Sequence, residues 1–146
     1  MRGSRWIFWM KALACAFTLG LAGCGNNGPP DFTLALASGQ TTAATITQGG
    51  TTPVIFQVTA VHGSTGSITL VLSGLPTGVG VAPGSATVGI GSPQTFTLNA
   101  AANAPVTSAP VTLTATGVSG NPLSSSSITH TQTLTLSVTA APPATP

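Results

Sequence analysis

Very few side chains of this chain could perform acid–base or metal chemistry. Asp31 is the single carboxylate, His62 and His130 are the two imidazoles, and there is no Glu or Tyr. A hydrolytic triad would require Asp31 to orient one histidine beside a serine, but no serine stands in the G-x-S-x-G pattern of a nucleophile turn. A zinc site needs three or four ligands, which two histidines cannot supply. We therefore expect no catalytic residue, no metal site and no cofactor, and we predict that the chain is not an enzyme.

Both histidines are expected to have structural roles. His130 shares its strand parity with Leu134 and Leu136, so it should pack at one end of the core with a hydrogen-bond partner. His62 directly precedes Gly63 in a turn-rich stretch, and we expect it to be exposed.

Charge is nearly absent and is confined to the beginning of the chain. The 146 residues include three basic side chains, Arg2, Arg5 and Lys11, and charged residues make up only 3%, against roughly 25% in an ordinary soluble domain. Beyond Lys11 the only permanently charged side chain is Asp31. Nucleic-acid binding depends on several cationic side chains at the phosphates, so this class of partner is excluded.

Residues 1–23 have the features of an export signal in the usual order. Arg2 and Arg5 form a positive beginning, and the cleanest apolar run spans residues 12–22. As a helix this run would extend about 16 Å, which is too short for a bilayer core of about 30 Å. We predict a cleaved signal peptide rather than a membrane-spanning helix.

The end of this segment, Leu21-Ala22-Gly23-Cys24, resembles the lipobox of bacterial lipoproteins. The resemblance implies a diacylglyceryl group on the sulfur of Cys24, cleavage before Cys24, and palmitate-type acylation of the new amino terminus. The partner of Cys24 would then be the lipid bilayer, because two or three acyl chains give a stable anchor. The alternative is an ordinary secretory cleavage site that leaves Cys24 as a free thiol.

The expected location is the extracytoplasmic side of a cell membrane. In a Gram-negative envelope the resemblance favours the outer membrane over the inner one, because Gly25 and not Asp follows the cysteine. Cys15 would leave with the signal peptide, so Cys24 would have no partner for a disulfide within the mature chain.

Residues 31–140 alternate apolar and polar side chains with a period of two, which is typical of strands with one buried face. Clusters of Gly, Pro and Ser separate these runs as turns do, and shorter alternating runs occupy 42–47 and 85–90. The positions expected to face inward are Phe32, Leu34, Leu36, Val54, Phe56, Val58, Ala60, Ile68, Leu70, Leu72, Phe96, Leu98, Val111, Leu113, Ala115, Leu134, Leu136 and Val138.

This pattern predicts an all-β fold, namely an Ig-like, two-sheet antiparallel sandwich of seven to eight strands preceded by a cleaved signal peptide. The chain divides into a lipoprotein signal peptide at 1–23, the lipidated Cys24 with a flexible tether at 24–30, the sandwich at 31–140, and a Pro-rich tail at 141–146.

A second resemblance covers most of the sandwich. The stretch GSITLVLSGLPTGV at residues 66–79 is similar to the core of bacterial Ig-like modules, including the NEW3-type domains attached to glycosidases. Residues 47–50 and 129–131 fit the segments that precede the second and last strands of such modules. The resemblance implies an accessory role, such as spacing, adhesion or assistance to a neighbouring domain.

Two main functions follow from these observations. The first is a non-enzymatic structural or protein-interaction module, with an envelope protein as a possible partner; the alternative is a carbohydrate-binding accessory module at the cell surface. A small hydrolase is a third and weaker hypothesis. Phe32, Phe56 and Phe96 all have inward parity, and their burial would favour the first function, whereas an exposed aromatic strip would favour the second.

The sheet edges lack the lysines that usually protect them. Pro53, Pro93 and Pro110 are expected at or beside strand starts, where a missing N–H interrupts further pairing. Because little charge repulsion remains, we predict that the domain self-associates through an edge strand.

Overall fold

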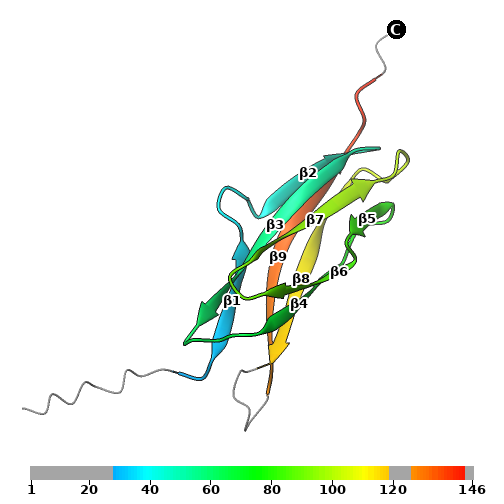
Figure 1. Ribbon diagram of the computed structural model, residues 1–146. Coiled ribbons are helices and arrows are strands. Elements are labelled where there is room, and N and C mark those ends of the chain that lie inside the picture. Colours follow the sequence, from blue (N-terminus) through cyan, green and yellow to red (C-terminus); the bar gives the residue numbers. More distant parts are fainter. Residues whose placement is uncertain (1–27, 119–125, 144–146) are drawn as a thin grey trace, which may run out of the picture.

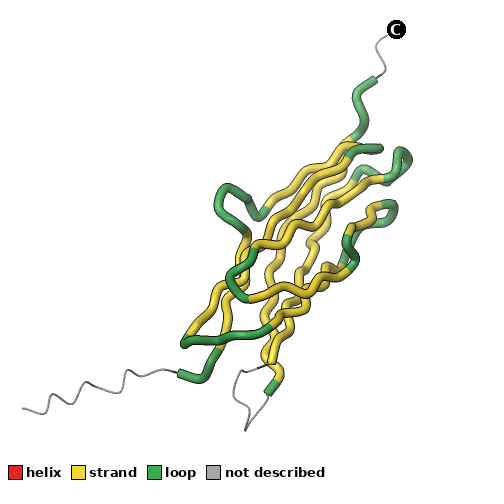
Figure 2. Tube along the Cα trace, in the orientation of Figure 1, coloured by secondary structure: helices red, strands yellow, loops and turns green. Residues whose placement is uncertain are grey.

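The computed structural model describes residues 28–118 and 126–143, which are built from strands and loops (Figures 1 and 2). The predicted signal peptide, Cys24 and the last three residues of the predicted tail lie outside the described residues. No helix within the described ranges is long and apolar enough to span a membrane. The strands are β1 (Asp31–Leu36), β2 (Ala43–Thr47), β3 (Thr51–Val61), β4 (Ser67–Ser73), β5 (Val79–Ala82), β6 (Ser85–Gly89), β7 (Pro93–Ala100), β8 (Thr107–Val118) and β9 (Ser127–Thr139).

The strands form two sheets that pack face to face. One sheet has the order β1-β3-β7-β5, and the other has the order β2-β9-β8-β4-β6. This arrangement confirms the predicted all-β, Ig-like sandwich. The described residues form nine strands, one more than the upper end of the expectation, because β5 was not predicted.

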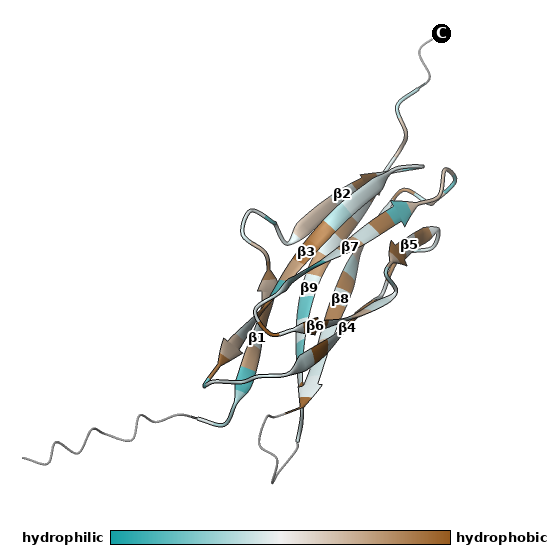
Figure 3. Cartoon of the chain, viewed as in Figure 1, coloured by the Kyte–Doolittle hydropathy of each residue, from teal (hydrophilic) through white to brown (hydrophobic). Residues whose placement is uncertain are grey.

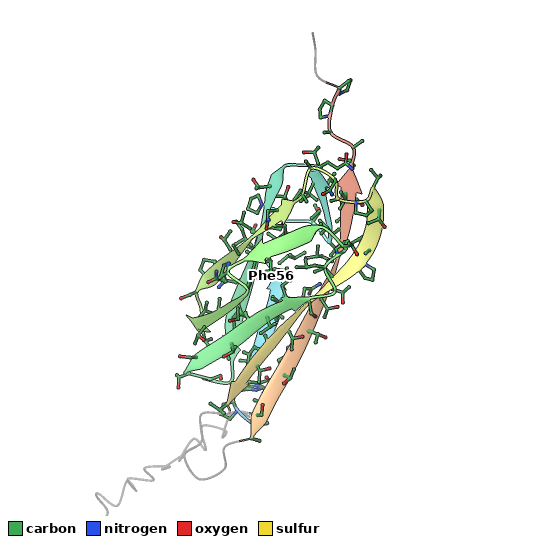
Figure 4. All side chains as sticks on the ribbon, turned by 90° about the vertical axis from the view of Figure 1, so that its right-hand side faces the viewer. Phe56 is labelled. Atoms are coloured by element: carbon green, nitrogen blue, oxygen red, sulfur yellow. The ribbon has the colours of Figure 1, made fainter. Side chains whose placement is uncertain are left out.

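The core lies between the sheets and is formed by the alternating apolar residues. In Figure 3 brown and pale bands alternate along the strands, and Phe56 points into the space between the sheets in Figure 4. Of the predicted inward residues, all but three are buried; Leu34 and Leu36 are partly buried and pack against the core. Ala60 is exposed, contrary to the prediction, because β7 begins opposite Gln57 and leaves the end of β3 without a neighbour on that side.

One strand pair is parallel, which differs from the antiparallel expectation. After Leu36 the chain leaves the first sheet and continues in the same direction in the second sheet as β2, which pairs in parallel with β9. All other neighbouring strands are antiparallel. The crossover closes one side of the sandwich, and no local pattern in the sequence reveals this change of sheet.

Strand β5 was missed because its sequence does not alternate. It has only four residues, its side chains are partly buried or exposed rather than alternating, and Gly80 stands in its middle opposite Asn99. A Cβ on Gly80 would lie 2.8 Å from the amide oxygen of Asn99. This strand therefore forms because it pairs with β7, and not because its own sequence alternates.

The three prolines lie where a neighbouring strand is missing. Pro93 is the first residue of β7, as predicted, whereas Pro53 and Pro110 lie inside β3 and β8. Pro53 lies beyond the last residue that pairs with β1, and Pro110 lies beyond the last residue that pairs with β4. Each proline thus has a free side, so its missing N–H removes no ladder hydrogen bond there.

The register of β4 leads to a direct stability test. Leu70 is completely buried and Thr69 is exposed. Leu70→Ala should lower the free energy of unfolding by about 2–5 kcal/mol, because it leaves a cavity, and the matched Thr69→Ala should lower it by less than about 1 kcal/mol. Urea unfolding followed by far-UV circular dichroism measures both values. Equal losses would show that the register is wrong.

Candidate functional site

The described titratable side chains gather at one end of the sandwich, where β1 and β9 begin. The Nε2–H of His130 in β9 donates a hydrogen bond of 2.8 Å to Oδ1 of Asp31 in β1. The Phe32 amide donates to the same oxygen at 2.7 Å, and the Phe32 ring meets the imidazole edge-on, with ring centroids 4.7 Å apart. Both polar side chains are about 38% exposed. The pair joins the first strand of one sheet to the last strand of the other.

The carboxylate is stabilised in its charged form. The hydrogen bond from His130 and, second, the bond from the Phe32 amide hold the pKa of Asp31 below its ordinary value, since both favour the ionised group. An ionised carboxylate only accepts hydrogen bonds, which places a proton on Nε2 of His130. The prediction of a hydrogen-bonded, partly packed His130 at one end of the core is therefore confirmed.

His62 lies at the same end, in the turn after β3. It is exposed, as predicted, and has a positive φ of 51° followed by Gly63 with φ of 72°. A Cβ on Gly28 would lie 2.8 Å from Cε1 of His62, so the chain entering β1 passes close to this imidazole. The turn and the beginning of the domain are thus packed together.

Among the described residues, this cluster includes neither a nucleophile nor a metal-binding group. The structure unites Asp31 and His130, two members of a hypothetical triad, yet no described serine or threonine hydroxyl forms a hydrogen bond with His130. Ser64, the one buried polar residue among the described residues, belongs to the turn after β3. Within residues 28–118 and 126–143, no group of three or more His, Cys, Asp or Glu side chains is placed to hold a metal ion. The arrangement can clamp two strands together.

The aromatic side chains do not form a binding platform. Phe32, Phe56 and Phe96 are buried, with exposed fractions of 1%, 0% and 0%. Phe56 and Phe96 contact each other edge-to-face at 6.1 Å between centroids. No other Phe, Trp or Tyr occurs among the described residues, so sugar stacking on an aromatic face is unavailable there.

A small hollow lies at the crossover from β1 to β2. Its volume is about 200 Å³, and it is lined by residues 39–41, 43–44 and 52–54, none of which is charged or aromatic. Thr52 Oγ1 donates to the carbonyl of Thr45 at 2.8 Å and ties the two sides of this region together. The hollow offers no convergent charged groups and suggests no particular ligand.

The outer face of the five-stranded sheet is uniformly uncharged. Across β4, β8 and β9, Thr69 lies opposite Thr116, which lies opposite Thr129. Two further rows on the same face contain Val71, Thr114 and Thr131, and then Ser73, Thr112 and Thr133. Val71 is 41% exposed within this array. The surface therefore presents hydroxyl and methyl groups whose β-branched side chains are stiff.

The pairing of Asp31 with His130 joins residues 99 positions apart. Sequence parity correctly placed His130 inward, but parity could not select Asp31 as its partner. The only sequence feature that pointed to Asp31 as the partner is that the chain has a single carboxylate side chain. Cys24, the predicted lipidation site, lies outside the described residues.

No known protein family and no curated protein matches the chain. Among solved structures, AggA, the major subunit of aggregative adherence fimbriae type I from Escherichia coli, is 13% identical with a TM-score of 0.50; the match covers 77% of this chain and 97% of AggA. Domains 4 and 5 of the S-layer protein SbsC are 19% identical with a TM-score of 0.49, covering 76% of this chain and 54% of that chain.

A chaperone–tip adhesin pre-assembly complex of Acinetobacter baumannii Csu pili matches with 14% identity and a TM-score of 0.47, covering 75% of this chain and 57% of that chain. The chain thus spans little more than half the length of the S-layer and pilus-complex chains. The likeness to AggA shows the fold, a β-sandwich of similar size.

The Asp31 pair predicts a loss of stability in acid. Because the pKa of Asp31 is lower in the folded chain than in the unfolded chain, its contribution is complete above about pH 4 and is lost as the pH falls through the lower folded value. We expect the free energy of unfolding to decline below about pH 4. Asp31→Asn should flatten this decline, because the sequence has no other Asp or Glu. Urea unfolding across this range measures the effect; an equally steep decline in the variant would contradict it.

Proposed function

We propose that this chain is a lipid-anchored extracytoplasmic protein whose single Ig-like sandwich acts as a non-enzymatic structural or protein-interaction module. The observation that carries this proposal is the distribution of side chains. All described aromatic residues are inside, and the outer face of the larger sheet carries uncharged Thr and Ser. A hydroxyl-rich, rigid face with exposed strand edges is suited to contact with other proteins rather than to turnover of a substrate.

The cluster around Asp31 supports the non-enzymatic part of the proposal. Its carboxylate is engaged by His130 and by the Phe32 amide, so both polar side chains serve to hold β1 against β9. Catalysis by a histidine–carboxylate pair would need a nucleophile within hydrogen-bond reach of the imidazole. AggA, which shares the fold, is a fimbrial subunit, a role in which a sandwich of this kind works as a structural unit.

The anchor rests on the lipobox-like ending at Cys24. Six residues lie between Cys24 and Asp31, so the seven Cα–Cα steps of the tether could reach at most about 25 Å. The domain begins at Asp31 and β9 ends at Thr139 at the opposite end of the sandwich (Figure 1). An anchored molecule would therefore hold the Asp31 end of the sandwich near the membrane, which is the outer membrane in a Gram-negative envelope.

The anchor can be tested by replacing the sulfur atom of Cys24. Cys24→Ser replaces the sulfur that would be alkylated, so the variant should remain unprocessed and should take up no radioactive palmitate, whereas the parent chain should be labelled. Cys15→Ser is the matched control and should be labelled like the parent. Palmitate incorporation into the Cys24→Ser variant would refute the lipoprotein assignment.

The carbohydrate-binding alternative predicts a different result in a sedimentation assay. With its three phenylalanines buried, the domain should remain in the supernatant when mixed with insoluble glucan, chitin or peptidoglycan. Retention that soluble oligosaccharide competes away would support a glycan-binding module instead. The Asp31→Asn variant serves as a control, because it leaves the buried phenylalanines and the threonine rows of the larger sheet unchanged.

A further inference from the structure

Half of the last strand has a free edge. β9 pairs with β8 from Ser127 to Val138, but β2 covers only its second half, from Thr135 to Thr139. β1 lies near the first half but belongs to the other sheet, where it pairs with β3. The segment from Ser127 to Leu134 is therefore a strand edge with no hydrogen-bonded neighbour on one side among the described residues.

The direction of the free backbone groups follows from the neighbouring half. The amide of Thr135 donates to the carbonyl of Thr42, on the side of β2. Because backbone groups point to alternate sides along a strand, four residues of the free half have N–H and C=O groups that point to that same side: Ser127, Thr129, Thr131 and Thr133. One of them is partly covered, since the side-chain amide of Gln132 donates to the carbonyl of Thr133 at 3.0 Å.

This edge has little protection against pairing. It contains no Pro, Lys, Arg, Asp or Glu, although charged side chains and prolines are the usual means by which proteins block such edges. The nearby carboxylate of Asp31 is directed at the His130 side chain rather than at the free backbone groups. Threonine-rich, β-branched sequence also favours extended pairing.

We propose that the free edge of β9 is an interaction surface that pairs with the same edge of a second copy of the chain, antiparallel and centred on Thr131. With the two-fold axis at Thr131, this residue lies opposite itself and Thr129 lies opposite Thr133. Three of the four residues with outward backbone groups then pair with one another, and each such pair exchanges both hydrogen bonds. Ser127, the first residue of β9, stays outside the pairing because β2 covers Thr135 of the second copy. The two five-stranded sheets become one continuous sheet.

The side chains fit a second copy on both faces of this pairing. On the outer face threonine meets threonine, which extends the uncharged rows of the sheet. On the inner face His130 lies opposite Gln132 of the second copy, so the one side chain of the edge that can gain a proton does not meet its own copy. An isologous contact places identical surfaces together. Two copies of an edge without charged side chains can therefore approach each other without electrostatic repulsion.

The arrangement is also compatible with two anchored chains. Asp31 is bonded to His130, one residue from the proposed axis, so the beginnings of both domains would lie beside the contact. Two tethers could then leave from the middle of the dimer toward one membrane. The pairing itself does not depend on the anchor, so failure of the palmitate test would leave it standing.

The register can be tested by cysteine cross-linking of the full chain in membranes, with a mild oxidant. Opposed residues of an antiparallel pair have Cα atoms about 5.5 Å apart, within the range of a disulfide, so Thr131→Cys should give a linked dimer as its main product. Thr116→Cys is the matched control, because it is exposed on the same face but lies in β8 between two paired strands. The parent chain reports any background from Cys15 and Cys24.

Two additional variants make the register specific. Thr129→Cys alone should not cross-link, because a shift of four residues separates its two copies by roughly 13 Å; mixed with Thr133→Cys chains it should form heterodimers. Thr131→Lys should abolish self-association in analytical sedimentation, while Thr116→Lys should retain it, with unchanged circular dichroism in both. Equal cross-linking at Thr131 and Thr116, no dimer at Thr131 in the folded chain, or a cross-link to a different protein would each overturn the proposal.

Discussion

Burial of one face of each strand is the constraint on which the rest of this structure depends. The chain has almost no charge from which to build ion pairs, and the one carboxylate among the described residues, Asp31, is hydrogen-bonded to His130. Its stability therefore depends on apolar side chains such as Phe56 and Leu70, which are fully buried between two sheets. Because every inward residue is followed by an outward one, filling this core also determines what the surface shows.

The surface that results is unusual for a β-sandwich. Outward positions that many proteins fill with Lys or Glu carry Thr, and the rows around Thr114 have neither charge nor aromatic rings. Threonine suits a strand because its branched side chain loses little freedom there. Yet it supplies neither repulsion between molecules nor protection for an edge. The same composition that gives a regular core thus leaves the molecule without protection against self-association.

The Asp31–His130 pair shows how a few polar atoms can connect two sheets in a domain that has almost no charged side chains. It joins the first strand of one sheet to the last strand of the other at the end where the chain enters the domain. Phe32 contributes to both aspects of this contact, since its amide binds the carboxylate and its ring packs on the imidazole. In this contact the Asp31 carboxylate and Nε2 of His130 hold two strands together.

The amino-acid sequence by itself determined the class of fold, the inward register of the main strands and the small number of titratable side chains, because these follow from local periodicity and composition. Leu70, Phe96 and Leu136 were placed correctly from alternation alone. Only the tertiary structure decided the parallel pairing of β2 with β9, the existence of β5, and the meeting of Asp31 with His130. Each of these depends on which distant segments become neighbours, and a two-residue repeat carries no information about its partner strand. The free half of β9 has the same origin, since it exists because the chain changes sheets after Leu36 and resumes only beside Thr135.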